Sequence, residues 1–457
     1  MPEQNFDLVV LGAGSGGYAA ALRATQLGLS VGLIEKGKVG GTCLHVGCIP
    51  TKALLHSAEV ADVTRESAKY GVTSTFGGVD VAGVTAYREE VVASKWKGLQ
   101  GLLKGRGITT IEGEGRLTSP TSVQVGDLTV TGKNVVLATG SYSRSLPGLE
   151  IGGRVITSEQ ALQLDYVPKK VLVLGGGVIG VEFSSVWKSW GAEVQIIEAL
   201  PHLVPNEDES ISKVFERQFR KRGIQFSLGV RFQSVTQNDQ GVVVTLEDGT
   251  TFDGDLLLVA VGRGPATANL GFEDVGITMD RGFVITDERL RTNIPGVWAV
   301  GDIVPGLQLA HRGFQQGIFV AEEIAGLNPI VVDDVNIPKV TYSDPEVASI
   351  GLTEAKAVEK FGADAIATYD YNLAGNGKSH IIGTSGNVKV VRQKDGPVLG
   401  VHMIGARVGE LIGEAQLAVN WEAYPEDIAP YIHAHPTQNE ALGEAFLAIA
   451  GKPLHGI

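Results

Sequence analysis

Two cysteines lie five positions apart in the segment Gly40-Gly41-Thr42-Cys43-Leu44-His45-Val46-Gly47-Cys48-Ile49-Pro50, and the 457 residues contain no others. In a reducing cytosol a close pair of this kind is more often catalytic than structural, and one pair cannot staple a chain of this length. A dithiol can carry two electrons by closing to a disulfide and opening again. The pair therefore predicts redox chemistry, and a zinc site is disfavoured because only His45 offers a further ligand nearby.

The spacing of the cysteines also predicts the path of the backbone between them. Five residues of regular helix separate two Cα atoms by roughly 8–9 Å, whereas a disulfide requires about 4.4–6.8 Å. If Cys43 and Cys48 are bridged, the chain between them must leave the helical path, and Gly47 makes that less costly. Pro50 suits the first turn of a helix over residues 51–56, so Cys48 is expected near a positive helix end, where a thiolate is favoured. The alternative is two unpaired buried thiols.

A histidine and a carboxylate lie close together near the end of the chain, in His435-Pro436-Thr437-x-x-Glu440. Such a pair can act as a general base and the group that orients it. Of the other histidines, His433 is a candidate for a supporting role. His402 lies in an apolar strand and is expected to be a core residue whose polar atoms are satisfied.

The elements that must position these groups include two copies of one pattern. A buried strand leads into Gly12-Ala-Gly14-Ser-Gly-Gly17, then a helix, then a strand that ends at Glu35. The same order recurs from Gly175-Gly-Gly177-Val-Ile-Gly180 to a strand that ends at Glu198. In this fingerprint the first glycine makes the turn, the second admits a pyrophosphate and the third lets the helix pack closely on the strand. The repeat predicts two dinucleotide sites.

The strand-end acids bear on which nucleotides are bound. Glu35 and Glu198 are each expected to accept hydrogen bonds from an adenosine ribose hydroxyl. An acid at this place also repels a 2′-phosphate, so Glu198 favours NAD over NADP. The alternative is that Glu198 merely ends a strand in solvent. Asp302, at the end of another apolar strand, can hold a polyol hydroxyl or cap the segment that follows it.

Composition narrows the class of protein. The 38 Lys and Arg residues against 51 Asp and Glu give a net charge of −13, which disfavours a nucleic-acid partner. The sequence lacks a long apolar stretch and begins without a basic or Arg-rich presequence, so a cytoplasmic protein with no membrane partner is expected. At 457 residues the chain is also too long for one core, and several domains are expected.

The motifs together resemble one protein family. The dithiol segment, Gly301-Asp302, Tyr342-x-x-Pro345-Glu346 and the run at 435–440 match, in order and spacing, the flavin disulfide oxidoreductases over essentially the whole chain. The closest resemblance is to the branch that oxidises protein-bound dihydrolipoamide. His45 and Thr51 replace the family's usual Asn and Ser, and the residues after His311 also depart from its usual pattern.

This resemblance implies FAD and NAD as cofactors, with no metal. It implies FAD contacts from Gly12, Gly14, Gly17, Glu35, Thr42, Gly115, Thr139, Gly140, Ser141, Asp302, Gln308, Leu309, Ala310 and His311. It implies NAD contacts from Gly175, Gly177, Val178, Gly180, Glu182, Glu198 and Gly262. Lys52 is expected near the flavin, paired with Glu182.

The resemblance also implies the fold and the domain limits. The fold is expected to be α/β, with two Rossmann-like dinucleotide-binding domains and a C-terminal α+β dimerisation domain. The FAD-binding domain is placed at 1–145 with a second part at 264–335, the NAD-binding domain at 146–263 and the interface domain at 336–457.

The activity implied is oxidation of dihydrolipoamide by NAD through a Cys43–Cys48 redox disulfide and FAD. His435, oriented by Glu440, would serve the dithiol of the other subunit of a homodimer. Expected partners are the lipoyl domains and acyltransferase core of 2-oxoacid dehydrogenase complexes.

Two alternatives remain. Within the family, the chain could be an NAD(P)H-dependent reductase of another disulfide or of a metal ion, although Glu198 disfavours NADPH. In another class, it could be mainly a docking subunit of a multienzyme complex. The intact set of Cys43, Cys48, His435 and Glu440 argues against a loss of catalysis.

Overall fold

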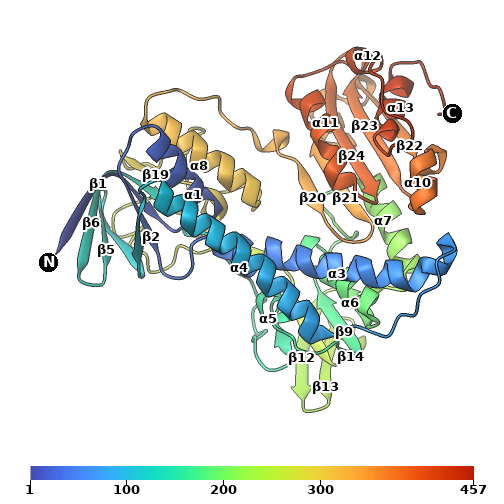
Figure 1. The fold of residues 1–457 in the computed structure, drawn as a ribbon, viewed down its shortest axis with the longest axis horizontal. Coiled ribbons are helices and arrows are strands. Elements are labelled where there is room, and N and C mark those ends of the chain that lie inside the picture. Colours follow the sequence, from blue (N-terminus) through green and yellow to red (C-terminus); the bar gives the residue numbers. More distant parts are fainter. Residues whose placement is uncertain (1, 457) are drawn as a thin grey trace.

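The computed structural model describes residues 2–456 of the chain. Figure 1 shows three lobes: an N-terminal sheet at the left, a second sheet at the bottom and the C-terminal part at the upper right. The long helices α3 (Cys48–Glu66) and α4 (Val81–Gly105) run between the lobes and pack on each other. The α/β class and the three-part architecture expected from the sequence are confirmed.

The first lobe is built on a sheet whose centre is β1 (Glu3–Leu11) and β6 (Leu128–Leu137). Its order is β3-β2-β1-β6-β5-β4, and a strand from much later in the chain, β19 (Val297–Ala299), pairs in parallel with β6. Leu8, Val9 and Val10 are fully buried, as expected for a strand covered on both faces. The other elements of this lobe are β2 (Val31–Glu35), β3 (Thr109–Glu112), β4 (Gly115–Ser119), β5 (Ser122–Val125), β17 (Met279–Asp280), β18 (Phe283–Val284), α1 (Ser15–Gln26) and α8 (Ala310–Ile324).

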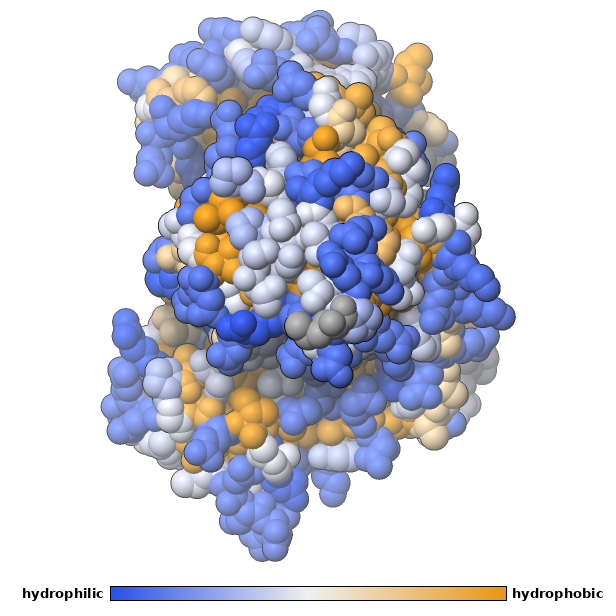
Figure 2. All heavy atoms as spheres, turned by 90° about the vertical axis from the view of Figure 1, so that its left-hand side faces the viewer, coloured by the Kyte–Doolittle hydropathy of each residue, from blue (hydrophilic) through white to orange (hydrophobic). Residues whose placement is uncertain are grey.

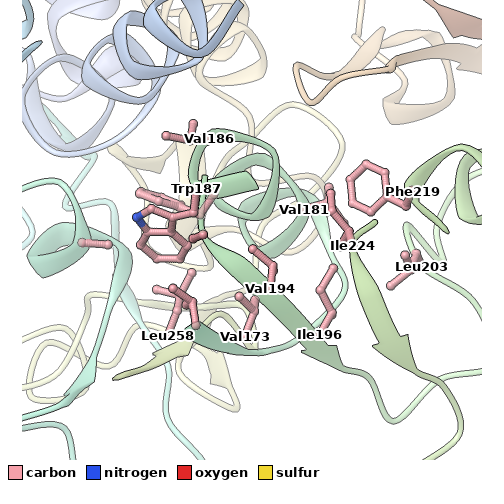
Figure 3. Packing of buried hydrophobic residues seen from close by; sticks show 14 of the residues in the cluster. Val173, Val181, Val186, Trp187, Val194, Ile196, Leu203, Phe219, Ile224 and Leu258 are labelled. Atoms are coloured by element: carbon pink, nitrogen blue, oxygen red, sulfur yellow. The ribbon is translucent and has the colours of Figure 1, made fainter. Parts of the chain in front are cut away.

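The second lobe repeats this plan around β9 (Lys170–Leu174), in a five-stranded parallel sheet of order β11-β10-β9-β15-β8. Helix α6 (Val178–Trp190) packs Val181 and Trp187 against the strand residues Val173 and Leu258 (Figure 3). The remaining elements are α5 (Ser158–Ala161), α7 (Glu209–Lys221), β8 (Val155–Ile156), β10 (Glu193–Ile197), β11 (Gln225–Ser227), β15 (Leu256–Val259) and an antiparallel layer of β12 (Phe232–Asn238), β13 (Gly241–Leu246) and β14 (Thr251–Gly254).

A short antiparallel ribbon joins the first two lobes. Strand β7 (Ser141–Ser143) leaves the first lobe, and β16 (Arg263–Pro265) returns beside it. The second lobe is therefore inserted into the first, which is completed only when the chain returns to form β19 and α8.

The third lobe is α+β, as the sequence predicts. Its antiparallel sheet has the order β20-β21-β24-β23-β22, and Ala415, Leu442 and Phe446 from its helices are buried against it. The strands are β20 (Lys339–Thr341), β21 (Glu346–Gly351), β22 (Ile366–Asn372), β23 (Asn387–Gln393) and β24 (Val398–Gly405). The helices are α9 (Glu354–Phe361), α10 (Gly377–Ile382), α11 (Val408–Asn420), α12 (Pro425–Ile428) and α13 (Glu440–Ile449).

Within residues 2–456, no helix combines the length and the apolar character needed to cross a membrane. Figure 2 shows polar and charged side chains over most of the face at the left of Figure 1, with apolar side chains in scattered patches.

Candidate functional site

The two cysteines lie on either side of a break between two helices. Helix α2 (Gly41–His45) carries Cys43, and α3 begins at Cys48, three residues earlier than the sequence predicts. Between them the backbone is not helical, with ψ of 22° at Val46 and −112° at Gly47. A Cβ on Gly47 would lie 2.8 Å from the carbonyl oxygen of Thr42, so the tight approach requires glycine. The predicted departure from a regular helix is confirmed.

The two thiols have opposite tendencies to ionise. Both are free and partly buried, and they lie close enough for each to change the ionisation of the other. The hydrogen bond from Cys43 lowers the pKa of Cys48, and the ammonium of Lys52 lowers it further against the opposing effect of burial. The same contact and burial raise the pKa of Cys43. Cys48 at the start of α3 is therefore the thiolate of the pair, and Cys43 is the proton donor.

A partly buried ion pair lies close to this thiolate. Lys52 Nζ, one turn along α3 from Cys48, is 2.9 Å from both carboxylate oxygens of Glu182 on α6. The backbone N–H of Tyr342 donates to Glu182 Oε1 at 2.9 Å, and Lys52 Nζ lies 4.6 Å from the centroid of the Tyr342 ring. The structure thus brings together Lys52 and Glu182, as the family resemblance implied. It adds Tyr342, whose ring contact no spacing in the sequence indicated.

The two glycine fingerprints have nearly identical turns. Gly12 and Gly175 adopt φ of +101° and +111°, and a Cβ on either would lie 2.3 Å from a carbonyl oxygen, of Ala138 and Ala260 respectively. Both constraints require glycine, so the role assigned to the first glycine holds in both copies.

The remaining fingerprint glycines divide in the same way in both copies. A Cβ on Gly17 would lie 1.8 Å from the carbonyl oxygen of Gly12, and one on Gly180 would lie 1.9 Å from that of Gly175. Added Cβ atoms on Gly14 and Gly177 would meet nothing within 4 Å, because both residues line a cavity. The N-termini of α1 and α6, which follow them, have no side-chain cap, so their N–H groups can hold phosphate oxygens.

The strand-end acids brace these turns. Each carboxylate accepts two backbone N–H groups. Glu35 accepts those of Ala13 and Gly37, both at 2.8 Å. Glu198 accepts those of Gly176 at 2.6 Å and Leu200 at 2.7 Å. Glu198 is only 8% exposed, so the alternative that it merely ends a strand in solvent is wrong.

One large cavity of about 1660 Å³ connects the two fingerprints and the dithiol. Such a volume exceeds the roughly 300–1,000 Å³ of an ordinary small-molecule pocket. The expected site residues that line it are Gly14, Thr42, Cys43, Cys48, Lys52, Gly140, Ser141, Gly175, Gly177, Val178, Glu182, Glu198, Gly262, Asp302, Gln308, Leu309, Ala310 and His311. Other expected residues lie in the surrounding structure and are not part of the lining: Gly12, Gly17, Glu35, Gly115, Thr139 and Gly180.

A polar cluster marks the cavity wall where the ribbon β7–β16 crosses. Ser141 Oγ donates to Asp302 Oδ2 at 2.5 Å, and Arg263 donates from Nε to Ser141 Oγ and from a terminal nitrogen to its carbonyl oxygen, both at 2.8 Å. Asp302 therefore holds a hydroxyl already, which fits its expected use toward a polyol. Sequence reasoning missed Arg263, although it directly follows the expected site residue Gly262.

The histidine–carboxylate pair lies outside this cavity. His435 Nδ1 is 2.8 Å from Glu440 Oε1, the other carboxylate oxygen accepts the N–H of Thr437 at 2.7 Å, and the His435–Pro436 peptide is cis. Burial raises the pKa of Glu440, but the hydrogen bonds from Thr437 and His435 outweigh it and lower the pKa. The His435 side chain is 78% exposed, and neither residue lines the cavity that holds Cys43 and Cys48. One chain alone does not bring the base to the dithiol.

Two other histidines each have a hydrogen-bond partner in the third lobe. His433 Nε2 lies 2.9 Å from Glu414 Oε1, and the second oxygen of Glu414 accepts the side-chain amide of Asn439 at 2.5 Å, just before α13. His402 is fully buried, but only its Nε2 has a partner, the carbonyl oxygen of Leu352 at 2.9 Å. The expectation that His402 is fully satisfied was wrong, because Nδ1 has no hydrogen-bond partner among the described residues.

Comparison with known proteins accounts for both parts of the chain. Residues 6–317 match the family described as pyridine nucleotide-disulphide oxidoreductase, and residues 337–446 match its dimerisation domain. A dihydrolipoyl dehydrogenase of Bacillus subtilis is 40% identical, over 98% of this chain and 99% of that protein. A leghemoglobin reductase of Vigna unguiculata is also 40% identical, over 98% of this chain and 88% of that protein.

Solved structures share the fold. The LpdA protein of Mycobacterium tuberculosis superposes with a TM-score of 0.90 at 26% identity, covering 98% of this chain and all 100% of that one. The HOCl-induced flavoprotein disulfide reductase RclA of Escherichia coli gives a TM-score of 0.88 at 28% identity, over 97% and 99% of the two chains.

Proposed function

Because the chain belongs to the pyridine nucleotide-disulphide oxidoreductase family, we propose that it oxidises protein-bound dihydrolipoamide to lipoamide with NAD, the reaction of a dihydrolipoamide dehydrogenase. The chain is an oxidoreductase, and FAD and NAD are its cofactors. Relatives named dihydrolipoyl dehydrogenase, about 40% identical over nearly the whole chain, support the choice of substrate.

One observation carries the proposal most directly: Cys43 and Cys48 lie close together in the lining of the cavity that reaches both fingerprints. The helix start at Cys48 and the nearby Lys52 make Cys48 the thiolate, while Cys43 keeps its proton. A dithiol that exchanges with a substrate thiol needs this division, because one sulfur must accept attack and the other must leave as an anion.

The chain's own groups fit the two cofactors. We assign FAD to the first fingerprint, with its pyrophosphate at the uncapped start of α1 beside Gly14 and a polyol hydroxyl at Asp302. We assign NAD to the second, with its pyrophosphate at the start of α6 beside Gly177 and its ribose at Glu198. When bound, FAD would supply the acceptor for the electron pair of the reduced dithiol, and NAD would supply the final acceptor. The remaining cofactor-binding residues named from the sequence belong to the same assignment.

The substrate step uses only sulfur and proton chemistry. A base removes the proton from one thiol of dihydrolipoamide, and the resulting thiolate attacks the sulfur of Cys43 in the Cys43–Cys48 disulfide. The bond between the cysteines breaks, and Cys48 leaves as a thiolate that Lys52 stabilises. The second substrate thiol then loses its proton and displaces Cys43, which releases lipoamide and leaves both cysteines reduced.

We assign the base to His435, held by Glu440. Bonding of Nδ1 to Glu440 fixes the ring and leaves Nε2 free to exchange a proton with the substrate. The dimerisation-domain match makes the protein a homodimer, and we propose that each His435 serves the dithiol of the other subunit. His435 is not among the residues that line the cavity of its own chain, and this supports the arrangement.

Partners and domain limits follow from the same assignment. We propose that lipoyl domains and the acyltransferase core of 2-oxoacid dehydrogenase complexes supply the substrate. We also propose an FAD-binding domain at 1–145 and 264–335, an NAD-binding domain at 146–263 and an interface domain at 336–457. The ribbon of β7 and β16 supports the limits near 145 and 263, because the chain crosses between lobes there.

Anaerobic titration of the purified protein with dihydrolipoamide tests the proposal. We expect a long-wavelength absorbance band from the Cys48 thiolate and the flavin, which added NAD should discharge. No spectral change with dihydrolipoamide, together with reduction by NADH or NADPH, would direct the search to another disulfide or a metal ion as substrate.

A further inference from the structure

All three lobes meet at the Lys52–Glu182 ion pair. Lys52 comes from α3 of the first part of the chain, Glu182 from α6 of the second lobe, and Tyr342 from the segment between β20 and β21 of the third. Tyr342 contacts both charges, through its N–H to Glu182 at 2.9 Å and through its ring, 4.6 Å from Lys52 Nζ. The ion pair next to the dithiol is therefore built partly by the lobe that carries the dimerisation domain.

The segment that presents Tyr342 is fixed against the second lobe. The N–H of Asp344 donates to Ser185 Oγ at 3.1 Å, and Arg222 donates to the carbonyl oxygen of Asp344 at 2.6 Å. Ser343 Oγ closes the turn by donating to the carbonyl oxygen of Pro345 at 2.8 Å. These bonds involve backbone atoms or neighbouring residues, so the Tyr342 ring can be changed without removing them.

The two charges of the ion pair are not equally confined. The side chain of Glu182 is 4% exposed, whereas that of Lys52 is 33% exposed. Lys52 lines the large cavity, and two groups of the chain hold its ammonium: the Glu182 carboxylate at 2.9 Å and the Tyr342 ring. The face of an aromatic ring attracts an ammonium through its quadrupole, and the attraction grows where water is excluded.

We propose that Tyr342 is a positioning residue whose ring holds the Lys52 ammonium between Glu182 and Cys48, so that the reactivity of Cys48 depends on a residue of the third lobe. The proposal deepens the proposed function, on which it rests for its catalytic meaning. The proposal predicts a change in the pKa of Cys48, which can be measured without any substrate.

The titratable groups around Cys48 come from several elements. Cys43 is on α2, Lys52 on α3 and Glu182 on α6. Tyr18 on α1 is close enough for the cysteines to contribute, after burial, to raising its pKa to about 12. Of these groups only Lys52 is a cation, so displacement of Lys52 must raise the pKa of Cys48.

The chain's cysteine content makes the measurement simple. In a Cys43→Ser background Cys48 is the only thiol, and the Cys43→Ser/Cys48→Ser protein provides a blank. The ultraviolet absorbance of the thiolate, recorded against pH in the flavin-containing protein, then gives the pKa of Cys48. Tyr342→Leu removes the ring and keeps the backbone N–H, while Tyr342→Phe removes only the hydroxyl.

We expect Tyr342→Leu to move the titration of Cys48 upward by roughly 0.5–1 pH unit, and Tyr342→Phe to leave it in place. Tyr70→Leu is the matched control, because Lys69 Nζ lies 5.4 Å from the Tyr70 ring in a contact away from the ion pair. That substitution should not move the titration.

An unchanged midpoint in Tyr342→Leu would overturn the proposal, as would equal shifts in the Leu and Phe variants. Thermal unfolding of each variant identifies a protein that has lost its fold. In that case a Tyr342→Met variant decides, because it fills space at this position without an aromatic face and should show the same upward shift. If dihydrolipoamide is not oxidised but the Leu shift is found, the proposed substrate fails and the role of Tyr342 stands.

Discussion

The dithiol and the His435–Glu440 pair differ in how much of their surroundings one chain supplies. Cys43 and Cys48 lie in a cavity with their helix start, their cation and both nucleotide fingerprints already in place. His435 has its carboxylate at 2.8 Å but is 78% exposed, with the dithiol elsewhere. One subunit thus holds the dithiol, its cation and both fingerprints around one cavity, whereas His435 lies outside that cavity. Our proposal that the other subunit supplies the base follows from this difference.

The largest effect on turnover is expected from a change in the dithiol. Cys48→Ser removes the leaving thiolate, so turnover with dihydrolipoamide should be abolished while the bound flavin remains. The yellow absorbance of the purified variant checks cofactor binding, and the rate of NADH formation checks catalysis. A variant that kept the wild-type rate would remove the dithiol from the mechanism.

A mixture of two inactive variants tests whether His435 serves the dithiol of the other subunit. Cys48→Ser and His435→Ala subunits, denatured and refolded together, should recover roughly a quarter of wild-type activity, because about half of the dimers are mixed and each of those has one intact site.

The opposite outcome is equally distinct. If His435 served the dithiol of its own chain, every subunit in the mixture would lack one of the two groups and no activity would return. Each variant refolded alone gives the baseline.

Glu440→Gln should weaken the base without removing it. The amide oxygen can still accept the N–H of Thr437, but the carboxylate that bonds to Nδ1 and orients the His435 ring is lost. We expect kcat with dihydrolipoamide to fall on the order of 100-fold.

The chain offers a matched control for this change. Glu444, one turn along α13, holds His455 through an equivalent contact of 2.8 Å. Glu444→Gln should leave kcat within a factor of two or so of wild type; an equal loss in both variants would mean that α13, and not the base, is affected.

The second fingerprint allows a milder test within the cavity. Glu198→Arg replaces a carboxylate that accepts two N–H groups beside the ribose site, so the KM for NAD should rise on the order of tenfold. The spectral response to dihydrolipoamide should be retained, because the dithiol lies apart from this turn. Glu193→Arg, the same charge change at the exposed start of β10, is the control and should leave the KM unchanged.

The smallest effect is a pH dependence within the dithiol. Since the pKa of Cys48 is lowered and that of Cys43 is raised, one thiolate should form below the ordinary thiol range as pH rises, and the second only well above it. The ultraviolet absorbance of the reduced protein should therefore rise in two widely separated steps. If both thiols ionised in one step at the ordinary pKa of a thiol, the predicted difference between the pKa values of Cys48 and Cys43 would be contradicted.

Much of this arrangement follows from the sequence because its causes are local. The interruption at Gly47 follows from the distance that two cysteines must span, and the turns at Gly12 and Gly175 follow from a repeated pattern. The pairing of Lys52 with Glu182 came from a family resemblance, since the two residues are 130 positions apart.

Other features depend on contacts between segments that are distant in the sequence, and no local sequence pattern indicates them. Arg263 reaches Ser141 only because β16 returns beside β7. The ring of Tyr342 reaches Lys52 only because the third lobe is packed against α3 and α6. The lack of a hydrogen-bond partner for His402 Nδ1 among the described residues likewise depends on which segments pack around the ring.

The pairing of β19 with β6 has a consequence for how the chain is made. The buried end of β6 at Val135, Val136 and Leu137 pairs with β1 on one side, but it gains its second parallel neighbour only from residues 297–299, after the whole second lobe has been inserted. During synthesis on the ribosome the second lobe can fold as soon as it emerges, while the first must wait with an open apolar strand edge. Until residues 297–299 are made, the nascent first lobe therefore exposes an apolar strand edge that can pair with another chain.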